Sequence, residues 1–256
     1  MQKQRYYKYY NNDKQIIESL FKKRKIRFSQ PYVFNDPLEF NPSFKFKLSL
    51  RNTYLPYCFD NSRFLSTEQY YQTHIIEPII NKYGILSLTD RPDYFNMWNF
   101  YANGHKGFVI EFKSDFNRHD NMLPIKDKTR PYPIKRVNYT EDYSIIIDNY
   151  FNDDGSIKKE QLLEYLFYTK TSRWAKENEY RMVRPLVDSV DYTDYYPTKE
   201  QSFRDIKVYL FNFSLSNISA IYFGACMSPE NKILFADYCK STNIVFYQSI
   251  LMTLLI

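Results

Sequence analysis

Apolar positions that alternate with polar ones predict several short strands along the chain. Ile26 and Phe28 alternate with polar residues over 25–29, which is typical of a strand buried on one face. Similar patterns predict strands over 5–10, 85–89, 107–112, 179–183, 206–213 and 218–224. The last apolar stretch, 244–256, predicts a buried final strand.

Helices are predicted between these strands. Residues 14–24 place apolar side chains on one helical face, and Asn12 or Asp13 can cap that helix. Ser66 and Gln69 form a capping box for a helix that is interrupted at Pro78 and ends near Gly84. Further helices are predicted over 92–104, 157–172 and 229–239, while 115–155 is predicted to be irregular.

The uneven order of strands and helices favours the α+β class. We expect one domain over residues 1–256, with a mixed, mostly antiparallel sheet and flanking helices. A hydrophobic content of 44% is enough for such a domain to bury its own core. No Gly-rich hinge or low-complexity linker divides the chain.

Charge and aromatic content leave the class of partner open. The net charge is +6, with Lys and Arg concentrated in the first 51 residues, which favours phosphate-rich partners without identifying a nucleic-acid binder. The 26 Tyr and 21 Phe indicate an AT-rich coding sequence and core packing, and they leave room for a surface on which nucleic-acid bases stack. The sequence indicates no oligomeric state.

Several site classes are disfavoured by what the chain lacks. The three cysteines, with no Cys-x-x-Cys pair, argue against a disulfide framework or structural zinc and predict reduced, mostly buried thiols in the cytoplasm: Cys58, Cys226 and Cys239. The three histidines are not at metal-ligand spacing, so no metal is predicted. No apolar stretch is long enough to span a bilayer, so no membrane partner is predicted.

Two segments present candidate binding residues. The Asn35-Asp36-Pro37 turn predicts a rigid loop, because Asn and Asp bond their own backbone and Pro fixes φ. It is either a structural corner or a ligand loop lined by Asn35, Asp36 and Glu39. Trp98 and Tyr101 stand at i and i+3 of a helix and lie side by side, either as core residues or as an aromatic floor for a base.

A pair of carboxylates supplies the candidate catalytic residues. Glu177 and Glu179 share one face of a strand that begins near residue 179, and Arg181 continues that face. Two carboxylates that lie close raise one another's pKa where the site is partly buried. The pattern indicates either ion pairs on a sheet surface or a catalytic pair.

These motifs, taken in order, resemble a bacterial family called domain of unknown function 2971, from about residue 6 to 247. The resemblance rests on Tyr-Lys-Tyr, Phe-Ser-x-Pro, Phe-Asn-Asp-Pro, Gly-Ile-Leu-Ser-Leu, Met-Trp-x-x-Tyr-Ala, His-Lys-Gly-Phe, Trp-x-x-Glu-x-Glu-Tyr-Arg and Ile-Tyr-Phe-Gly. It implies a bacterial cytoplasmic protein from an accessory or anti-phage defence locus.

The chain also resembles ADP-ribosyltransferases, less closely. That resemblance implies a split sheet and NAD as substrate, with Arg5 or Lys8 on the cofactor phosphates and Ser29 on the second strand. It implies that Glu179, or Glu177, stabilises the positive charge that develops on ribose as nicotinamide leaves. Trp98 or Tyr101 would stack on the nicotinamide ring.

We therefore expect an ADP-ribosyltransferase-like or NAD-cleaving effector, serving as a toxin or in anti-phage defence. This function requires Glu177 and Glu179 to face Ser29 and the first strand across one cleft. One alternative is a nucleic-acid-binding or nucleic-acid-processing factor, which requires a basic stripe beside exposed Tyr side chains. Another is a non-enzymatic sensor or interaction module, which requires an exposed apolar patch without a deep polar cleft.

Overall fold

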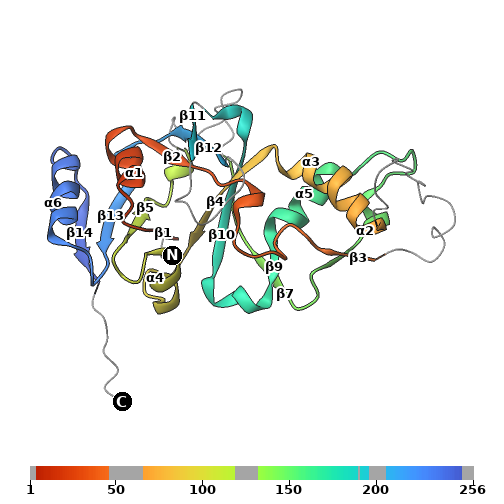
Figure 1. The fold of residues 1–256 in the computed structure, drawn as a ribbon, viewed down its shortest axis with the longest axis horizontal. Coiled ribbons are helices and arrows are strands. Elements are labelled where there is room, and N and C mark those ends of the chain that lie inside the picture. The colour runs from red at the N-terminus through yellow and green to blue at the C-terminus, as the bar shows by residue number, and fades with distance from the viewer. Residues whose placement is uncertain (1–3, 46–65, 119–131, 190, 196–205, 250–256) are drawn as a thin grey trace, which may run out of the picture.

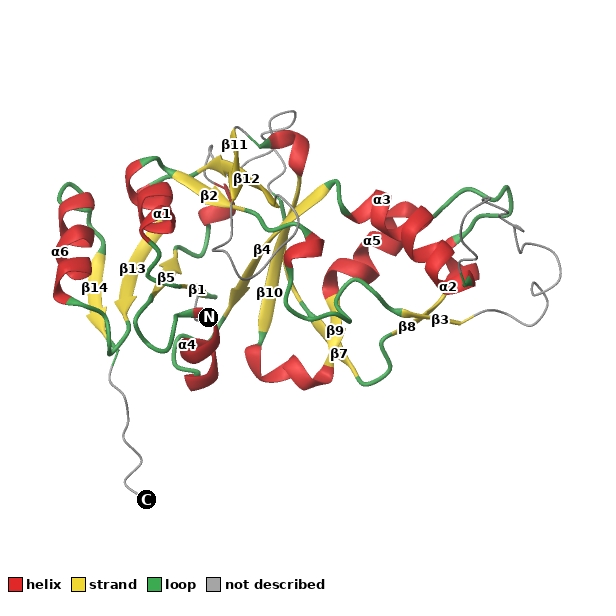
Figure 2. Cartoon of the chain, in the orientation of Figure 1, coloured by secondary structure: helices red, strands yellow, loops and turns green. Residues whose placement is uncertain are grey.

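The computed structural model describes residues 4–45, 66–118, 132–189, 191–195 and 206–249 (Figure 1). The predictions made for Cys58 and for residues 250–256 lie outside these ranges. The molecule is elongated, with α1 and α6 toward one end and α2, α3 and α5 toward the other (Figure 1). Strands cross its middle between them (Figure 2).

Seven strands form the main sheet, in the order β14-β13-β5-β1-β4-β10-β6. Neighbouring strands are antiparallel except for β13 and β14, so the mixed, mostly antiparallel α+β sheet expected from the sequence is confirmed. Their bounds are β14 Val245–Gln248, β13 Ile218–Phe223, β5 Phe108–Phe112, β1 Tyr6–Tyr10, β4 Tyr83–Thr89, β10 Glu179–Pro185 and β6 Ile134–Arg136.

Three smaller sheets accompany the main one. The first is three-stranded and antiparallel, with strands β11 Asp191–Tyr195, β12 Ile206–Asn212 and β2 Lys25–Arg27. The other two are parallel pairs, β3 Ser43–Lys45 with β8 Ser144–Ile146, and β7 Asn138–Thr140 with β9 Thr169–Thr171. The region 115–155, expected to be irregular, therefore holds β6, β7 and β8. They are three residues each and carry too little alternation to be recognised in the sequence.

The main sheet splits between β1 and β4. β4 pairs with β10 along the whole of Glu179–Pro185, but β1 and β4 pair only where Tyr7 meets Thr89. Beyond that point Ser29, just after β2, bridges to Ile85 of β4. The Lys8 ammonium donates a hydrogen bond across the gap to the Ser87 carbonyl oxygen, at 3.1 Å. The split opens space between the strands that carry several candidate residues.

The helices follow the predicted boundaries in part. The helix expected over 14–24 is α1, Lys14–Ile17, continued by a π-helical turn, Glu18–Lys22. Ser66 and Gln69 form the expected capping box, with hydrogen bonds of 2.9 and 3.2 Å. The helix that follows is divided into α2 Thr67–Tyr70, a π-helical turn Tyr71–Ile76 and α3 Glu77–Ile80, with Pro78 in the first turn of α3.

The remaining helices are α4 Phe95–Tyr101, α5 Lys159–Tyr168 and α6 Pro229–Tyr238. Short 3-10 turns span Pro31–Val33, Phe116–Arg118, Ile147–Tyr150, Ser172–Glu177, Leu186–Asp188 and Leu215–Asn217. Within the described ranges no helix is long and apolar enough to cross a membrane.

Four sequence predictions are wrong, three about elements and one about a cysteine. The helix expected over 157–172 ends at Tyr168, because the β-branched Thr169 and Thr171 join the ladder with β7. Gly84 lies in β4 instead of ending a helix, and a Cβ there would stand 2.7 Å from the Phe28 Cβ. β14 is an exposed edge strand, not a buried one. Cys239 is buried as expected, but Cys226 is exposed.

Apolar clusters cover both faces of the sheet. On one face α1 and α6 pack on β5 and β13, and the rings of Phe21, Phe108 and Phe235 contact one another at centroid distances of 4.7–6.0 Å. On the other face α4 covers β1 and β5, while α3 and α5 cover β4 and β10. The gap between these last two clusters lies over the split in the sheet.

Candidate active site

A cavity of about 220 Å³ occupies the split between β1 and β4. Five parts of the chain line it: β1, the loop over 29–39, β4, α4 and the segment from β9 to the start of β10. Its polar lining residues are Tyr7, Lys8, Tyr9, Ser29, Asn35, Asp36, Glu39, Ser87, Thr89, Tyr101, Lys170, Glu177 and Glu179, with Trp174 beside them.

Most of the candidate residues meet in this cavity. Both carboxylates line it, together with six other residues singled out in the sequence: Lys8, Ser29, Asn35, Asp36, Glu39 and Tyr101. Glu177 and Glu179 therefore face Ser29 and the first strand across one cleft, which is the arrangement that the NAD-cleaving function requires.

Three candidates lie elsewhere. Arg5 precedes β1, its side chain is 61% exposed, and it pairs with Glu111 at 3.4 Å, away from the cavity. Trp98 is a core residue whose indole donates to the Pro92 carbonyl oxygen and stacks on His105, so it provides no floor for a ligand. Arg181 does not line the cavity, because its guanidinium is fully buried behind Glu179.

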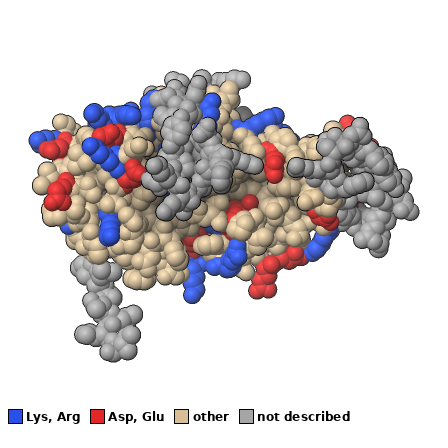
Figure 3. Space-filling model, in the orientation of Figure 1, with Lys and Arg blue, Asp and Glu red and all other residues tan. Residues whose placement is uncertain are grey.

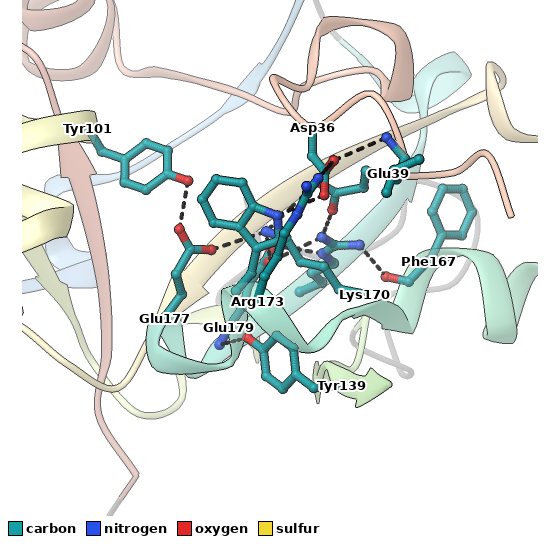
Figure 4. A network of polar contacts seen from close by, with 12 residues as sticks. Asp36, Glu39, Tyr101, Tyr139, Phe167, Lys170, Arg173, Glu177 and Glu179 are labelled. Atoms are coloured by element: carbon teal, nitrogen blue, oxygen red, sulfur yellow. Dashed lines mark hydrogen bonds and ion pairs between the residues drawn. The ribbon is translucent and has the colours of Figure 1, made fainter. Parts of the chain in front are cut away.

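Five charged side chains form what we call the buried ion network: Glu39, Lys170, Glu177, Glu179 and Arg181 (Figure 4). The Lys170 ammonium lies 3.1 Å from a Glu177 oxygen, 3.0 Å from a Glu179 oxygen and 3.8 Å from a Glu39 oxygen. All five side chains are less than 10% exposed. The network is thus a desolvated group of charges at the wall of the cavity.

Arg181 anchors the network from behind. Its Nε donates to Glu179 at 2.7 Å, one Nη donates to the Phe167 carbonyl oxygen at 2.8 Å, and the other contacts both Glu179 and Glu39. The rings of Phe34 and Phe40 lie within 6 Å of its guanidinium carbon. A planar group held by so many partners fixes the orientation of Glu179.

A turn in the backbone lies between the two catalytic candidates, Glu177 and Glu179. Glu177 ends a 3-10 turn, Asn178 has φ 44°, and Glu179 begins β10. Asn tolerates this left-handed conformation better than most residues, because its short polar side chain bonds locally. The backbone on both sides is pinned, since Thr89 Oγ1 donates to the Glu177 carbonyl oxygen at 2.6 Å and the Glu179 N–H donates to the Tyr139 hydroxyl at 2.8 Å.

The wall opposite β4 is built around Asp36. Its carboxylate accepts hydrogen bonds from the Leu38 N–H at 3.1 Å, from the Trp174 indole at 2.8 Å and from Arg173. The first bond closes the turn expected from the Asn-Asp-Pro sequence. The second holds the indole beside Lys170, whose ammonium lies 5.1 Å from the ring centroid.

Lys170 was not among the sequence candidates. The helix predicted over 157–172 includes Thr169-Lys170-Thr171, which the structure places in β9 instead. The β-branched residues on both sides were the available signal for a strand, and in a strand Lys170 points to one face. Its position between three carboxylates depends on chain contacts that a local pattern does not contain.

Burial is the largest single influence on the pKa values of Lys170, Glu179 and Arg181. Burial lowers the pKa of Lys170, but the attraction of Glu179 and Glu177 outweighs it and raises the pKa overall. Burial raises the pKa of Glu179, Lys170 opposes that shift, and Glu177 adds to it. Burial lowers the pKa of Arg181, although an arginine in a protein remains protonated.

Two other groups that line the cavity also have shifted pKa values. Burial lowers the pKa of Lys8 to about 8, with Glu179 opposing the shift and Arg27 adding to it. Burial, together with the nearby Glu177 carboxylate, raises the pKa of Tyr101. The Tyr101 hydroxyl donates to Glu177 at 2.7 Å and therefore remains protonated at neutral pH.

The formal charges of the network leave one carboxylate in excess. Within the network, the three carboxylates of Glu39, Glu177 and Glu179 pair with the two cations Lys170 and Arg181. Asp36 is paired with Arg173, and Lys8 on β1 lies near enough to Glu179 for the two charges to interact. An excess negative charge in a desolvated wall favours a cationic group, or a group that becomes cationic during a reaction. Among the described residues, no cluster of three or more His, Cys, Asp or Glu side chains is arranged to hold a metal ion.

Comparison with known proteins adds a family match over part of the chain. Residues 97–182 match the family described as "Protein of unknown function (DUF2971)". The resemblance expected from the motifs is thereby confirmed for this segment, which carries Tyr101, Lys170, Glu177 and Glu179. No curated protein and no solved structure matches the chain.

Proposed function

We propose that this protein cleaves the bond between nicotinamide and ribose in NAD, as an ADP-ribosyltransferase or an NAD glycohydrolase. The observation that carries the proposal is the convergence of Glu177 and Glu179 on one cavity, in a network with an excess negative charge. In a bacterial cytoplasm such an activity would serve as a toxin or in anti-phage defence, because it consumes a central cofactor or modifies a target.

The charge of the cavity suits this substrate. The nicotinamide ring of NAD carries a positive charge, and the ribosyl group becomes positive as the ring leaves. A cationic ring beside Glu179 opposes the effect of burial on the pKa of that carboxyl and keeps it ionised. The Trp174 indole and the Tyr101 ring are both at the wall, where either can pack against a planar ring.

The reaction proceeds in two steps at the ribose C1′ atom. The C1′–N1 bond breaks, its electron pair returns to the ring nitrogen, and neutral nicotinamide leaves. Glu179, fixed by Arg181 and Lys170, stabilises the cationic ribosyl group. A hydroxyl or amine of an acceptor, or water, then bonds to C1′ and gives its proton to Glu177.

Release of nicotinamide from NAD tests the proposal. The purified chain is incubated with NAD and cell extract, which supplies acceptors and activators, and nicotinamide is measured by chromatography. We expect release by the wild type, and a loss of about 100-fold or more in Glu179→Gln and in Glu177→Gln. Glu179→Gln should fold, since the network then holds two carboxylates and two cations.

Glu164→Gln is the matched control, because Glu164 is an exposed acid on α5 that lies outside the cavity. Its rate should equal that of the wild type. Absence of nicotinamide release by the folded wild type, or equal rates in Glu179→Gln and wild type, would refute the proposal.

A further inference from the structure

A second cavity, of about 710 Å³, adjoins the first. The two share four lining residues, Lys8, Tyr9, Ser29 and Tyr101, so they meet at the split between β1 and β4. The remaining walls of the second cavity come from α1, the π-helical turn after it, β2 and β12. A ligand in the first cavity can therefore extend past Lys8 and Ser29 into the second.

The second cavity has a basic lining. Four basic side chains line it against two acidic ones, and the basic ones are Lys8, Lys23, Lys25 and Arg27. One of the acids, Asp13, is engaged as the cap of α1, where it accepts the Gln15 N–H at 2.7 Å. Basic side chains appear along the upper edge of the molecule, over α1 and β2, interspersed with acidic ones (Figure 3).

Lys8, at the junction of the cavities, and Arg27, in the second cavity, repel one another. The charge of Arg27 lowers the pKa of Lys8, in addition to the effect of burial, so the two groups are close enough to interact. Lys8 donates to one backbone oxygen, and an ammonium has three donors in all. An anionic ligand at the junction would reduce the repulsion between Lys8 and Arg27 and accept hydrogen bonds from the remaining N–H groups of Lys8.

The volumes of the two cavities also favour a ligand that occupies both. Binding pockets for small molecules and cofactors usually measure about 300–1,000 Å³. The first cavity, at about 220 Å³, is large enough for a base and its ribose but not for a dinucleotide. The second provides the space that the rest of such a ligand needs.

We infer that the second cavity is a nucleoside diphosphate subsite, in which Lys8, Lys23, Lys25 and Arg27 hold the diphosphate of a ligand whose reactive ribosyl group lies in the first cavity. The inference rests on the proposed function and makes it more specific, because it assigns the diphosphate of the substrate to named residues of the second cavity. It also moves the phosphates away from Arg5, which the sequence had suggested as their partner.

Binding of ADP to the full chain, measured by isothermal titration calorimetry, tests the subsite. We expect ADP to bind the wild type and to be displaced by inorganic pyrophosphate. Binding should weaken by roughly tenfold or more in Lys23→Gln/Lys25→Gln, since each charge-assisted hydrogen bond contributes about a factor of ten. Lys23→Gln alone, at an exposed position, should show a smaller loss.

The control Lys82→Gln/Lys113→Gln removes the same charge at exposed positions outside both cavities and should bind ADP as the wild type does. The subsite is wrong if ADP does not bind the wild type, if pyrophosphate does not compete, or if the Lys23/Lys25 variant binds ADP unchanged. Normal ADP binding without NAD turnover would refute the proposed reaction and leave the subsite in place.

Discussion

Replacing Lys170 with Met should destabilise the fold strongly and in a pH-dependent way. Lys170 is the cation that three buried carboxylates share, at 3.0, 3.1 and 3.8 Å. Its loss leaves those carboxylates with Arg181 as their only cation in the network, and removing one partner of a buried ion pair costs about 3–5 kcal/mol. Met conserves most of the side-chain volume, so the loss reports the charge and not a cavity.

The pH dependence follows from Glu179. Its pKa in the folded wild type is raised by burial and held down by Lys170, so in Lys170→Met it should rise further above the unfolded value. A carboxyl whose folded pKa is raised contributes stability that is fully present below the unfolded pKa, about 4.3, and is lost as the pH rises through the folded pKa. The deficit of the variant should therefore be greatest at pH 7.5 and smaller at pH 5.

Urea unfolding followed by far-ultraviolet circular dichroism measures both effects. We expect a deficit of about 3–5 kcal/mol in the free energy of unfolding at pH 7.5, and recovery of part of it in Lys170→Met/Glu177→Gln. The control Lys135→Met removes an exposed lysine paired with the exposed Glu164 and should change stability by less than about 1 kcal/mol. A deficit below about 1 kcal/mol in Lys170→Met, or one that is equal at both pH values, would show that the network does not depend on Lys170.

Three further changes test other parts of the account. The pKa of Lys8 in the folded state is lowered to about 8 from 10.5, so the stability that Lys8 contributes is present above pH 10.5 and lost as the pH falls through 8. In urea unfolding, the free energy of unfolding of Lys8→Met should therefore rise by at least about 1 kcal/mol relative to that of the wild type when the pH is lowered from 10 to 7.5. A difference between the two proteins that is the same at both pH values would contradict this. Gly107→Ala places a Cβ 2.1 Å from the Tyr10 carbonyl oxygen and should lower stability by about 3 kcal/mol or more, so an unchanged melting temperature would be evidence against the packing of β1 on β5. Tyr101→Phe removes the hydrogen bond to Glu177 and should reduce NAD turnover by about tenfold with a stability loss near 1 kcal/mol, whereas full turnover would show that the hydroxyl is not needed.

Elements with a strong local signal were predicted well from the sequence. The alternation of Ile26 and Phe28 placed both side chains in the core, where each is fully buried. The Ser66–Gln69 capping box has the expected pair of hydrogen bonds, because its geometry depends on only four residues. The boundary between α5 and β9 was missed, since pairing with β7, distant in the sequence, overrides the helical pattern there.

The cavity could be predicted only in part. The i, i+2 spacing of Glu177 and Glu179 was enough to place both carboxylates on one side, although Asn178 joins a 3-10 turn to a strand between them. The i, i+3 spacing of Trp98 and Tyr101 gave neighbouring side chains but not their surroundings, and only Tyr101 reaches the cavity. The split between β1 and β4, which creates the cavity, has no counterpart in local sequence.

The central claim is that the reactive ribose of NAD lies against Glu177 and Glu179. A crystal structure of the full chain with an isosteric carbon-linked analogue of NAD, which cannot lose its nicotinamide, tests it most directly. C1′ should lie in the cavity between β1 and β4, within about 4 Å of a carboxylate oxygen of Glu177 or Glu179, with the ring beside Trp174 or Tyr101. An analogue bound at saturating concentration elsewhere on the chain, with this cavity empty, would contradict it.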